Sequence, residues 1–303
     1  MADPPRRSGF ATVVGRPNVG KSTLINTMVG TKVSIVSSRP NTTRHNVRGI
    51  LHRPDAQVVF VDTPGLHRPR TALGERLNET AGATLADVDV VVAMVDATAA
   101  VGPGDRMVLE RALAAGGRDG PAVLVAVNKI DAAGGDDVLV RLATVAEAVD
   151  RLAEGLGSAD APDVEYFPVS AATGKGVSAL VDAVVARLPE GPAYYPEDMV
   201  TDTPEALAVA ELVREQLLVR ARDELPHAIA CRVTEWEWPR IRCEILVERD
   251  SQKAIVIGRG GEVLKAVGIA VRQQLPPGAY LELFVRVEKR WQQRTDALDR
   301  LGY

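Results

Sequence analysis

Three short motifs between residues 15 and 131 combine glycine, lysine, hydroxyl and carboxylate groups at spacings that suit a bound nucleotide. The first, residues 15–22, reads Gly-Arg-Pro-Asn-Val-Gly-Lys-Ser and directly follows the apolar run Phe10–Val14. Glycines let backbone N–H groups surround phosphate oxygens, and the start of a helix adds partial positive charge. The residues that we expect to contact the phosphates and their metal are Gly15, Asn18, Val19, Gly20, Lys21, Ser22 and Thr23. Lys21 suits the β- and γ-phosphates, and Ser22 suits Mg²⁺.

The second motif, Asp62-Thr63-Pro64-Gly65, follows the apolar run Gln57–Val61. Its aspartate suits a water-mediated contact with Mg²⁺, and its glycine N–H suits the γ-phosphate. Alone, this tetrapeptide is a common turn. Its position after a strand, downstream of a phosphate loop, favours a sensor of the γ-phosphate.

The third motif, residues 128–131, reads Asn-Lys-Ile-Asp and follows the apolar run Ala122–Val127. The Asp131 carboxylate can accept hydrogen bonds from guanine N1–H and the 2-amino group, which adenine does not offer in this form. Asn128 can tie the loops together, and the stem of Lys129 can pack along the base. A backbone N–H of Ser170-Ala171 can contact guanine O6. Together with the two phosphate motifs, this order predicts a guanine nucleotide.

Between the first two motifs lies the polar segment Ser37–His45, which shows no helical or strand periodicity. A threonine hydroxyl in such a segment can close onto Mg²⁺ and the γ-phosphate, which would make the segment an order–disorder switch. Spacing alone does not decide whether Thr42 or Thr43 plays this part.

The elements around these motifs alternate between buried strands and helices. Near-continuous apolar runs predict strands at Phe10–Val14, Val58–Val61, Val88–Val95, Ala122–Val127 and Tyr166–Val169. Helical patterns are found at Thr71–Ala86, Asp105–Ala115, Asp136–Glu154 and Val177–Leu188. This alternation predicts an α/β domain with a doubly wound, mostly parallel sheet, whose ligand lies at the carboxyl ends of the strands.

A Pro- and Gly-rich stretch, Pro189–Pro196, indicates a linker, and a second pattern follows it. A helix from Pro204 to about Asp223 leads to segments at Ala228–Thr234, Arg240–Val247, Ser251–Ile257, Glu262–Leu275 and Tyr280–Val287. The order α-β-β-α-α-β predicts a smaller α+β domain. We therefore expect domains at residues 1–190 and 204–303, with a linker at 191–203.

The second domain contains a G-x-x-G loop, Gly258-Arg259-Gly260-Gly261, between two helical patterns. KH domains use such a loop to clamp a nucleic-acid backbone, because glycine lets phosphates approach closely. Arg259 and Lys265 can add positive charge there. Residues 251–303 hold nine Lys and Arg against five Asp and Glu, although the whole chain carries a net charge of −4. This basic end favours an anionic partner.

Composition excludes several other classes of protein. Hydrophobic residues make up 46% of the 303 residues and charged residues 25%, which is typical of a globular protein. The longest apolar runs have six residues, against about 18 for a membrane span. The N-terminus has no apolar stretch typical of a secretory signal. Two cysteines, Cys231 and Cys243, supply neither a disulfide framework nor a zinc site, so we expect a cytoplasmic protein.

The motifs G-R-P-N-V-G-K-S, N-T-T-R-H, D-T-P-G-L-H, N-K-I-D and V-S-A resemble those of the Era-like GTPases (TrmE–Era–EngA type). The resemblance covers nearly the whole chain and extends to a type II KH domain. It implies a GTPase with Mg²⁺ held by Ser22, Thr43 and Asp62, and with Lys21, Thr43 and Gly65 in the catalytic set. It also implies a monomer that binds 16S rRNA and assists assembly of the 30S subunit. Whether the protein also associates peripherally with the membrane is left open.

The position after Gly65 holds Leu66, where Ras-type switches carry a water-orienting Gln, so we expect slow intrinsic hydrolysis. In related GTPases an Asn at the position of Asn18 helps to hold K⁺, and the alternative is a simple turn residue. Two other functions remain open: a KH RNA chaperone whose nucleotide site is mainly structural, and a metabolic P-loop enzyme such as a kinase. No role is assigned to the insertion Ala153–Pro162.

Overall fold

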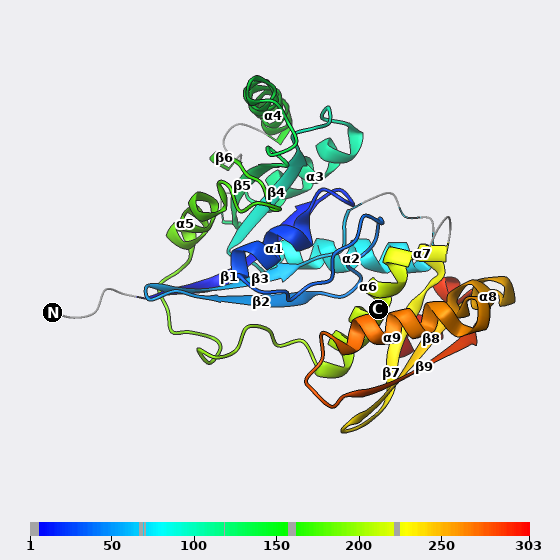
Figure 1. Ribbon diagram of the computed structural model, residues 1–303. Coiled ribbons are helices and arrows are strands. Elements are labelled where there is room, and N and C mark those ends of the chain that lie inside the picture. Colours follow the sequence, from blue (N-terminus) through cyan, green and yellow to red (C-terminus); the bar gives the residue numbers. More distant parts are fainter. Residues whose placement is uncertain (1–5, 67–68, 70, 118, 157–161, 221–224) are drawn as a thin grey trace. The chain divides into compact units, whose positions relative to one another are not determined.

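The computed structural model describes residues 6–66, 69, 71–117, 119–156, 162–220 and 225–303 (Figure 1). The chain divides into two compact units. The first comprises Met1–Ser34, Thr43–Arg68 and Leu77–Asp202, and the second comprises Ile35–Thr42, Pro69–Arg76 and Thr203–Tyr303. Two short segments from the first part of the chain therefore belong to the second unit, which the linear order of motifs did not predict.

The first unit is built on a six-stranded sheet with the order β2-β3-β1-β4-β5-β6. Its strands are β1 (Arg7–Gly15), β2 (Val47–His52), β3 (Ala56–Asp62), β4 (Val90–Asp96), β5 (Ala122–Asn128) and β6 (Val164–Pro168). All neighbouring pairs are parallel except β2 and β3. This arrangement confirms the predicted doubly wound sheet. Only β2, an antiparallel strand at one end of the sheet, was not predicted.

Helices cover both faces of this sheet (Figure 1). Side chains of α1 (Lys21–Val29) and α5 (Val177–Arg187) form one apolar core against the strands. Side chains of α2 (Ala72–Ala86), α3 (Pro103–Ala115) and α4 (Gly135–Leu156) form a second core on the other face. Because the inner strands β3, β4 and β5 are buried on both faces, their sequences are nearly continuously apolar rather than alternating. Residues 157–161 of the insertion lie outside the described residues.

The strand register brings the residues of the predicted nucleotide motifs to one end of the sheet. Val13 on β1 lies opposite Asp62 at the end of β3, and Asp96 at the end of β4 lies opposite Asn128 at the end of β5. The loops after these strands therefore share one rim of the sheet, as expected for ligand binding in an open α/β fold.

The predicted linker, residues 191–203, has neither helix nor strand, yet hydrogen bonds hold it to the first unit. The buried side chain of Gln57 accepts from the N–H groups of Tyr194 (2.7 Å) and Tyr195 (3.0 Å) and donates to the Tyr195 carbonyl (2.8 Å). Further along, Ile50 N–H on β2 donates to the Val200 carbonyl (2.9 Å). This segment is thus bound along the sheet rather than free of it, and the first unit extends to Asp202.

Asp202, at the end of this segment, makes two side-chain contacts. Its carboxylate accepts from Arg48 Nη1 on β2 at 2.7 Å and from the Tyr195 hydroxyl at 2.8 Å. We call residues 191–202 the strap from here on.

The second unit contains a three-stranded sheet with the order β7-β8-β9, in which β7 (Ala230–Glu237) is antiparallel and β9 (Tyr280–Val287) parallel to β8 (Arg240–Val247). Side chains of α6 (Glu205–Arg220), α8 (Asp250–Ile257) and α9 (Glu262–Arg272) pack with one face of this sheet into a single core. This confirms the predicted α-β-β-α-α-β order. Two short helices, α7 (Leu225–Ala228) and α10 (Thr295–Leu301), were not predicted.

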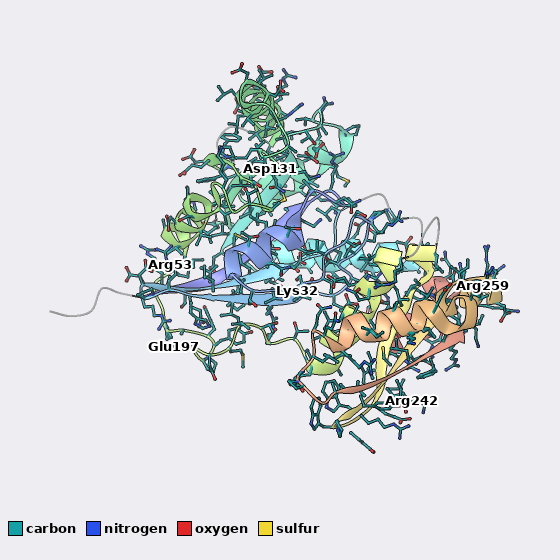
Figure 2. All side chains as sticks on the ribbon, in the orientation of Figure 1. Lys32, Arg53, Asp131, Glu197, Arg242 and Arg259 are labelled. Carbon is teal, nitrogen blue, oxygen red and sulfur yellow. The ribbon has the colours of Figure 1, made fainter. Side chains whose placement is uncertain are left out.

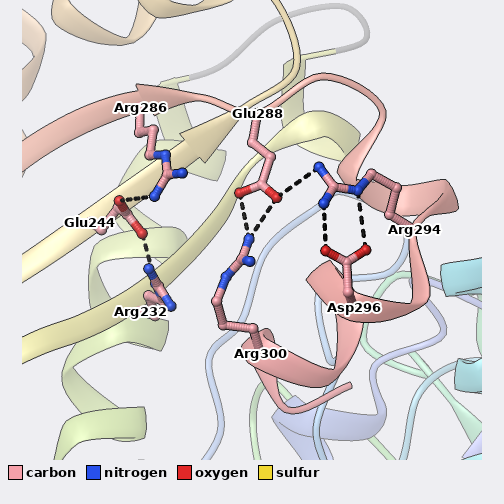
Figure 3. A network of polar contacts seen from close by, with 7 residues as sticks. All are labelled: Arg232, Glu244, Arg286, Glu288, Arg294, Asp296 and Arg300. Carbon is pink, nitrogen blue, oxygen red and sulfur yellow. Dashed lines mark hydrogen bonds and ion pairs between the residues drawn. The ribbon is translucent and has the colours of Figure 1, made fainter.

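Two buried carboxylates form ion pairs with arginines in this unit (Figure 3). Glu244 on β8 accepts a hydrogen bond from Arg232 on β7 (2.6 Å), and Arg286 on β9 lies 3.6 Å from it. Glu288, just after β9, is 7% exposed and accepts from Arg300 on α10 at 2.5 and 2.6 Å. Because a buried carboxylate is costly without partners, the pairs of Glu244 join the three strands, and the pair of Glu288 with Arg300 joins α10 to the end of β9.

Candidate functional site

The first motif forms the loop between β1 and α1. Gly20 caps the start of α1 with a φ of 107°, which is open to glycine and strained for other residues. A Cβ at this position would also lie 2.5 Å from Asn128 Nδ2. Val19 is buried, and its carbonyl accepts a hydrogen bond from Asn128 Nδ2 (2.8 Å). The phosphate loop and the base-recognition motif are therefore joined directly.

Lys21 begins α1 and is buried, with only 7% of its surface exposed. Its Nζ donates to the carbonyls of Gly15 (3.2 Å) and Arg16 (3.0 Å). Burial lowers the pKa of Lys21 to about 8, against an opposing effect of the Asp62 charge. A Cβ on Gly65 would lie 3.1 Å from this Nζ, so the lysine ammonium and the glycine of the second motif face the same space.

The three predicted metal ligands meet beside Lys21. Ser22 Oγ and Thr43 Oγ1 are 2.9 Å apart, and Thr43 Oγ1 donates to Asp62 Oδ2 at 3.3 Å. Asp62 is fully buried, and its Oδ1 has no hydrogen-bond partner among the described residues. Burial raises the pKa of Asp62, although hydrogen bonds from Ser22 and the charge of Lys21 oppose the shift.

This donor set fits a hard cation. Two hydroxyls and one carboxylate with an unpaired oxygen suit Mg²⁺, which prefers a few protein oxygens together with phosphates and water. A divalent cation at this point would also favour the charged form of Asp62. Among the described residues, no group of three or more His, Cys, Asp or Glu side chains could hold a metal elsewhere.

The structure distinguishes the two threonines that spacing left open. Thr42 Oγ1 is used inside its own segment, where it donates to the Arg39 carbonyl and lies 2.6 Å from Ser37 Oγ. Thr43 Oγ1 instead lies between Ser22 and Asp62. The geometry thus favours Thr43 as the metal ligand.

Within the second motif, the threonine side chain has a structural role. Thr63 Oγ1 donates to the Val13 carbonyl of β1 (3.3 Å), and both Thr63 and Pro64 are buried. Leu66 is 1% exposed and belongs to the core that α2, α3 and α4 form. This position therefore supplies packing and no polar group for a water. His67 lies outside the described residues.

Asn128 is the centre of the base-recognition site. It is 2% exposed, and besides its bond to Val19 its Oδ1 accepts from the Ala171 N–H at 2.9 Å. The neighbouring Ser170 N–H donates to the Lys175 carbonyl (2.8 Å). Both N–H groups that we predicted for guanine O6 are thus already engaged, so the Ala171 N–H would have to be shared between Asn128 and the base.

Asp131 is exposed on the loop between β5 and α4 (Figure 2), where its carboxylate is available to a ligand. Lys129 has a φ of 69°, and its Nζ pairs with Asp96 Oδ2 at the end of β4 (2.6 Å). Burial acts to raise the pKa of Asp96, but hydrogen bonds from Lys129 and Thr98 outweigh it and lower the pKa. The sequence predicted the lysine stem beside the base but not this ion pair, which anchors the lysine head.

The G-x-x-G loop lies in the second unit, where α8 ends and α9 begins. Gly258 has a φ of 76°, and a Cβ there would lie 2.5 Å from Val263 Cγ2. Gly260 and Gly261 also have positive φ values, whereas a Cβ on either would meet open space. Arg259 projects from the tip of this loop (Figure 2), and Lys265 is exposed on the first turn of α9.

Two exposed apolar side chains on the helices that flank this loop were not predicted. Ile255 on α8 is 58% exposed and Ile269 on α9 is 42% exposed. Both helices bury other apolar residues in the core. The sequence pattern alone therefore distinguishes an exposed apolar residue on such a helix only weakly. Trp291, near the end of the chain, is fully buried and donates to the Ala228 carbonyl (2.9 Å).

Two known families match separate parts of the chain. The family of 50S ribosome-binding GTPases matches residues 10–129, and the KH domain family matches residues 224–292. No helix among the described residues combines the length and apolar character needed to cross a bilayer.

Full-length relatives and solved structures match as well. GTPase Era of Mycobacterium sp. (strain KMS) is 47% identical over 309 residues, covering 98% of this chain and 99% of the relative. GTPase Era of Mycobacterium tuberculosis (strain ATCC 25177 / H37Ra) is 47% identical over 308 residues, covering 98% of both. A crystal structure of an Aquifex aeolicus Era variant bound to GDP and AlF4⁻ matches with a TM-score of 0.86 at 35% identity, over 98% of this chain and 99% of that one. Era in complex with MgGDPNP and nucleotides 1506–1542 of 16S ribosomal RNA matches with a TM-score of 0.87 at 36% identity, with the same coverage.

Proposed function

The chain belongs to the Era family of GTPases, and from this premise we propose that it is a GTP-controlled factor that binds 16S rRNA and assists assembly of the 30S subunit. The observation that carries the proposal is the meeting of Ser22, Thr43 and Asp62 beside the buried Lys21. A threonine from a loop that reaches the metal position is the arrangement by which a GTPase senses the third phosphate.

Hydrolysis would rest on positioning and charge. Mg²⁺, held by Ser22 and Thr43 directly and by Asp62 through water, would supply charge to the β- and γ-phosphates. Lys21 binds the same phosphates, and the Gly65 N–H donates to the γ-phosphate. Because Leu66 is buried and apolar, no side chain at that position orients the attacking water. The proposed intrinsic rate is therefore low.

Guanine would be read by residues at the ends of β5 and β6. Asp131 accepts from guanine N1–H and the 2-amino group, Lys129 lies along the base, and Asn128 holds the phosphate loop against the Ser170-Ala171 turn. RNA would bind at the Gly258–Gly261 loop, with Arg259 and Lys265 supplying positive charge. The exposed Ile255 and Ile269 suit contact with bases.

Potassium is a further element of the proposal. Asn18 is exposed at the phosphate loop with a φ of 64°, a conformation that Asn tolerates in turns. If its side-chain oxygen helps to hold K⁺ at the phosphates, GTP turnover in KCl exceeds that in NaCl, and Asn18→Gly, which keeps the backbone conformation, removes the difference. Equal rates in both salts for the unmodified protein would refute a role for K⁺.

We propose further that the protein works as a cytoplasmic monomer and that any association with the cell membrane is peripheral. The two buried cysteines, Cys231 and Cys243, are both free thiols, which suits a reducing compartment. Sedimentation and flotation with vesicles of anionic lipid test the oligomeric state and the membrane contact.

The function as a whole is tested by crosslinking to RNA. Protein loaded with a GTP analogue is crosslinked to total cellular RNA, and the bound fragments are sequenced. Enrichment of the 3′ region of 16S rRNA, weaker with GDP, is the expected result. Equal RNA recovery with both nucleotides would favour a KH RNA chaperone whose nucleotide site is mainly structural.

A further inference from the structure

The turn that follows β4, residues 96–98, reads Asp-Ala-Thr and lies outside the nucleotide motifs in the sequence. In the structure it is joined to the base-recognition motif. The strand register places Asp96 opposite Asn128, and the Ala97 N–H donates to the Asn128 carbonyl at 2.7 Å. Ala97 is 2% exposed and belongs to the core that α2, α3 and α4 form. The turn is therefore a fixed support for the first residue of the motif.

Both carboxylate oxygens of Asp96 have partners. Its Oδ1 accepts from the Thr98 N–H (2.9 Å) and from the Thr98 hydroxyl (2.6 Å), which hold the carboxylate in one orientation. Its Oδ2 accepts from Lys129 Nζ at 2.6 Å. The side chain of Asp96 is only 12% exposed and that of Lys129 is 37% exposed. A short, charge-assisted hydrogen bond between such groups is stronger than an ion pair at the surface.

Lys129 is thus held at both ends. Its backbone has a φ of 69°, and its carbonyl accepts from the Ala132 N–H at 3.0 Å. The next residue, Ile130, donates its N–H to the Val169 carbonyl after β6 (3.3 Å). At the other end, the ammonium is fixed by Asp96. The four-carbon stem between these points has therefore lost most of its freedom before a ligand arrives.

This arrangement has two physical consequences for a ligand. Ordering a long side chain during binding costs free energy, and a side chain that is already ordered avoids that cost. The Asp96 carboxylate also neutralises the ammonium, so Lys129 offers an apolar stem rather than a charge. Such a stem suits the flat face of a base more than it suits a phosphate.

We propose that Asp96 is a positioning residue of the guanine site, which holds Lys129 so that its stem packs along the base. The inference rests on the place of Lys129 beside the base in the proposed function. It adds that Asp96 acts through Lys129 and has no contact of its own with the nucleotide. Its loss weakens the binding of GDP and GTP alike and leaves the hydrolysis step unchanged.

Two substitutions and a control isolate this effect. Asp96→Asn keeps the shape of the side chain and an oxygen for Thr98, but it removes the charge that holds Lys129. Lys129→Ala removes the stem through which Asp96 acts, and it keeps a Cβ, so the steric cost of the positive φ stays the same. Asp137→Asn, at the exposed start of α4, removes the same charge elsewhere in the same unit.

We expect Asp96→Asn to weaken GDP affinity about fivefold, measured with a fluorescent analogue. The KM for GTP should rise by the same factor, while kcat at saturating GTP should change less than about twofold. In the Lys129→Ala background, Asp96→Asn should have no further effect on GDP affinity, because a residue that acts through another loses its effect when that residue is gone. Asp137→Asn should behave like the unmodified protein.

Unchanged GDP affinity in a folded Asp96→Asn variant would overturn the inference. So would the same loss of affinity with and without the lysine, which would show that Asp96 acts by another route, and so would a fall in kcat as large as the rise in KM. Lys129→Ala separates this failure from that of the proposed function. If Lys129→Ala weakens GDP binding while Asp96→Asn does not, only the inference fails. If Lys129→Ala keeps full GDP affinity, the proposed role of Lys129 fails, and the inference with it.

Discussion

At the scale of single residues, the nucleotide site depends on charges that the fold has taken out of water. Lys21 and Asp62 are both buried, and each has a pKa displaced toward its neutral form. A buried charge is costly unless an opposite charge or a metal compensates it. Phosphates beside Lys21 and a divalent cation beside Asp62 would compensate both, so binding of MgGTP and ionisation of these two groups should be linked.

This linkage gives a pH-dependent prediction for Lys21. Its pKa in the folded protein is about 8, against 10.5 for an ordinary lysine. At about pH 9 the free protein therefore holds this side chain mainly neutral, and phosphates that raise its pKa draw in a proton. Calorimetric titration with GDP at about pH 9, in buffers of different ionisation enthalpy, should show proton uptake that disappears near pH 7. Guanosine, which has no phosphates, is the control, and uptake that is equal with guanosine would contradict the assignment.

The choice of base is a second prediction at this scale. Asp131→Asn exchanges an acceptor for a donor, so the preference should move from GTP to xanthosine triphosphate. An unpaired polar group in such a site can discriminate by about 10⁴. Competition between the two nucleotides measures the change. Asp136→Asn, at the exposed start of α4, removes the same charge nearby and should leave GTP preference intact. Unchanged GTP affinity in the Asp131 variant would refute the role of this carboxylate.

Much of this site could be predicted residue by residue, and the exceptions have a common physical cause. Gly15 to Ser22 and Asp62 to Gly65 were predicted because their motifs are continuous in sequence. Spacing left Thr42 and Thr43 equally open and only the family resemblance implied Thr43, which the bond from Thr42 to the Arg39 carbonyl also favours. The pairing of Lys129 with Asp96 joins two strands and leaves no local pattern in the sequence.

At the scale of elements, the turn between α8 and α9 is the part of the second unit best suited to a phosphate backbone. Its three glycines have positive φ values, and the space beside Gly260 and Gly261 is open. Strands and helices were predicted well where apolar periodicity was strong, as in β1, β5 and α9. The strand β2 was missed because Val47–His52 is short and includes Arg48 and Gly49, and it becomes a strand by pairing with β3.

A matched pair of substitutions at Gly260 tests this turn. Asp and Asn have nearly the same shape and both tolerate a left-handed conformation, here a φ of 59°. Gly260→Asp places negative charge where a phosphate binds and should weaken RNA binding about tenfold more than Gly260→Asn, or by ~1.4 kcal/mol. RNA and GTP affinities are measured on the same preparations, with circular dichroism to establish folding, and GTP affinity should not change.

Equal RNA affinity of the Asp and Asn variants would mean that no phosphate lies near Gly260. Arg259→Ala provides an independent check, because loss of one phosphate contact should reduce the slope of log affinity against log salt by about one. An unchanged slope would place the RNA backbone away from this side chain.

At the scale of the whole molecule, the two compact units were predicted in outline but not in membership. The sequence indicated a GTPase domain followed by a KH domain, since each has its own motif and its own pattern of elements. It gave no sign that Ile35–Thr42 and Pro69–Arg76 join the second unit. Such membership depends on contacts between residues more than a hundred positions apart, for example Val36 with Glu215, which periodicity does not record.

The strap has a consequence for how the protein can be divided. An outermost strand with free N–H and carbonyl groups is a template for pairing with other molecules, and proteins usually protect such an edge. Here the Val200 carbonyl accepts a hydrogen bond from the Ile50 N–H of β2, and the backbone of Tyr194 and Tyr195 forms hydrogen bonds with the buried side-chain amide of Gln57. A GTPase fragment that stops at residue 190 should therefore aggregate and melt at a lower temperature, while one that stops at Asp202 stays soluble. Light scattering and thermal denaturation of the two fragments compare them, and equal behaviour would show that the strap is dispensable as a guard against self-association.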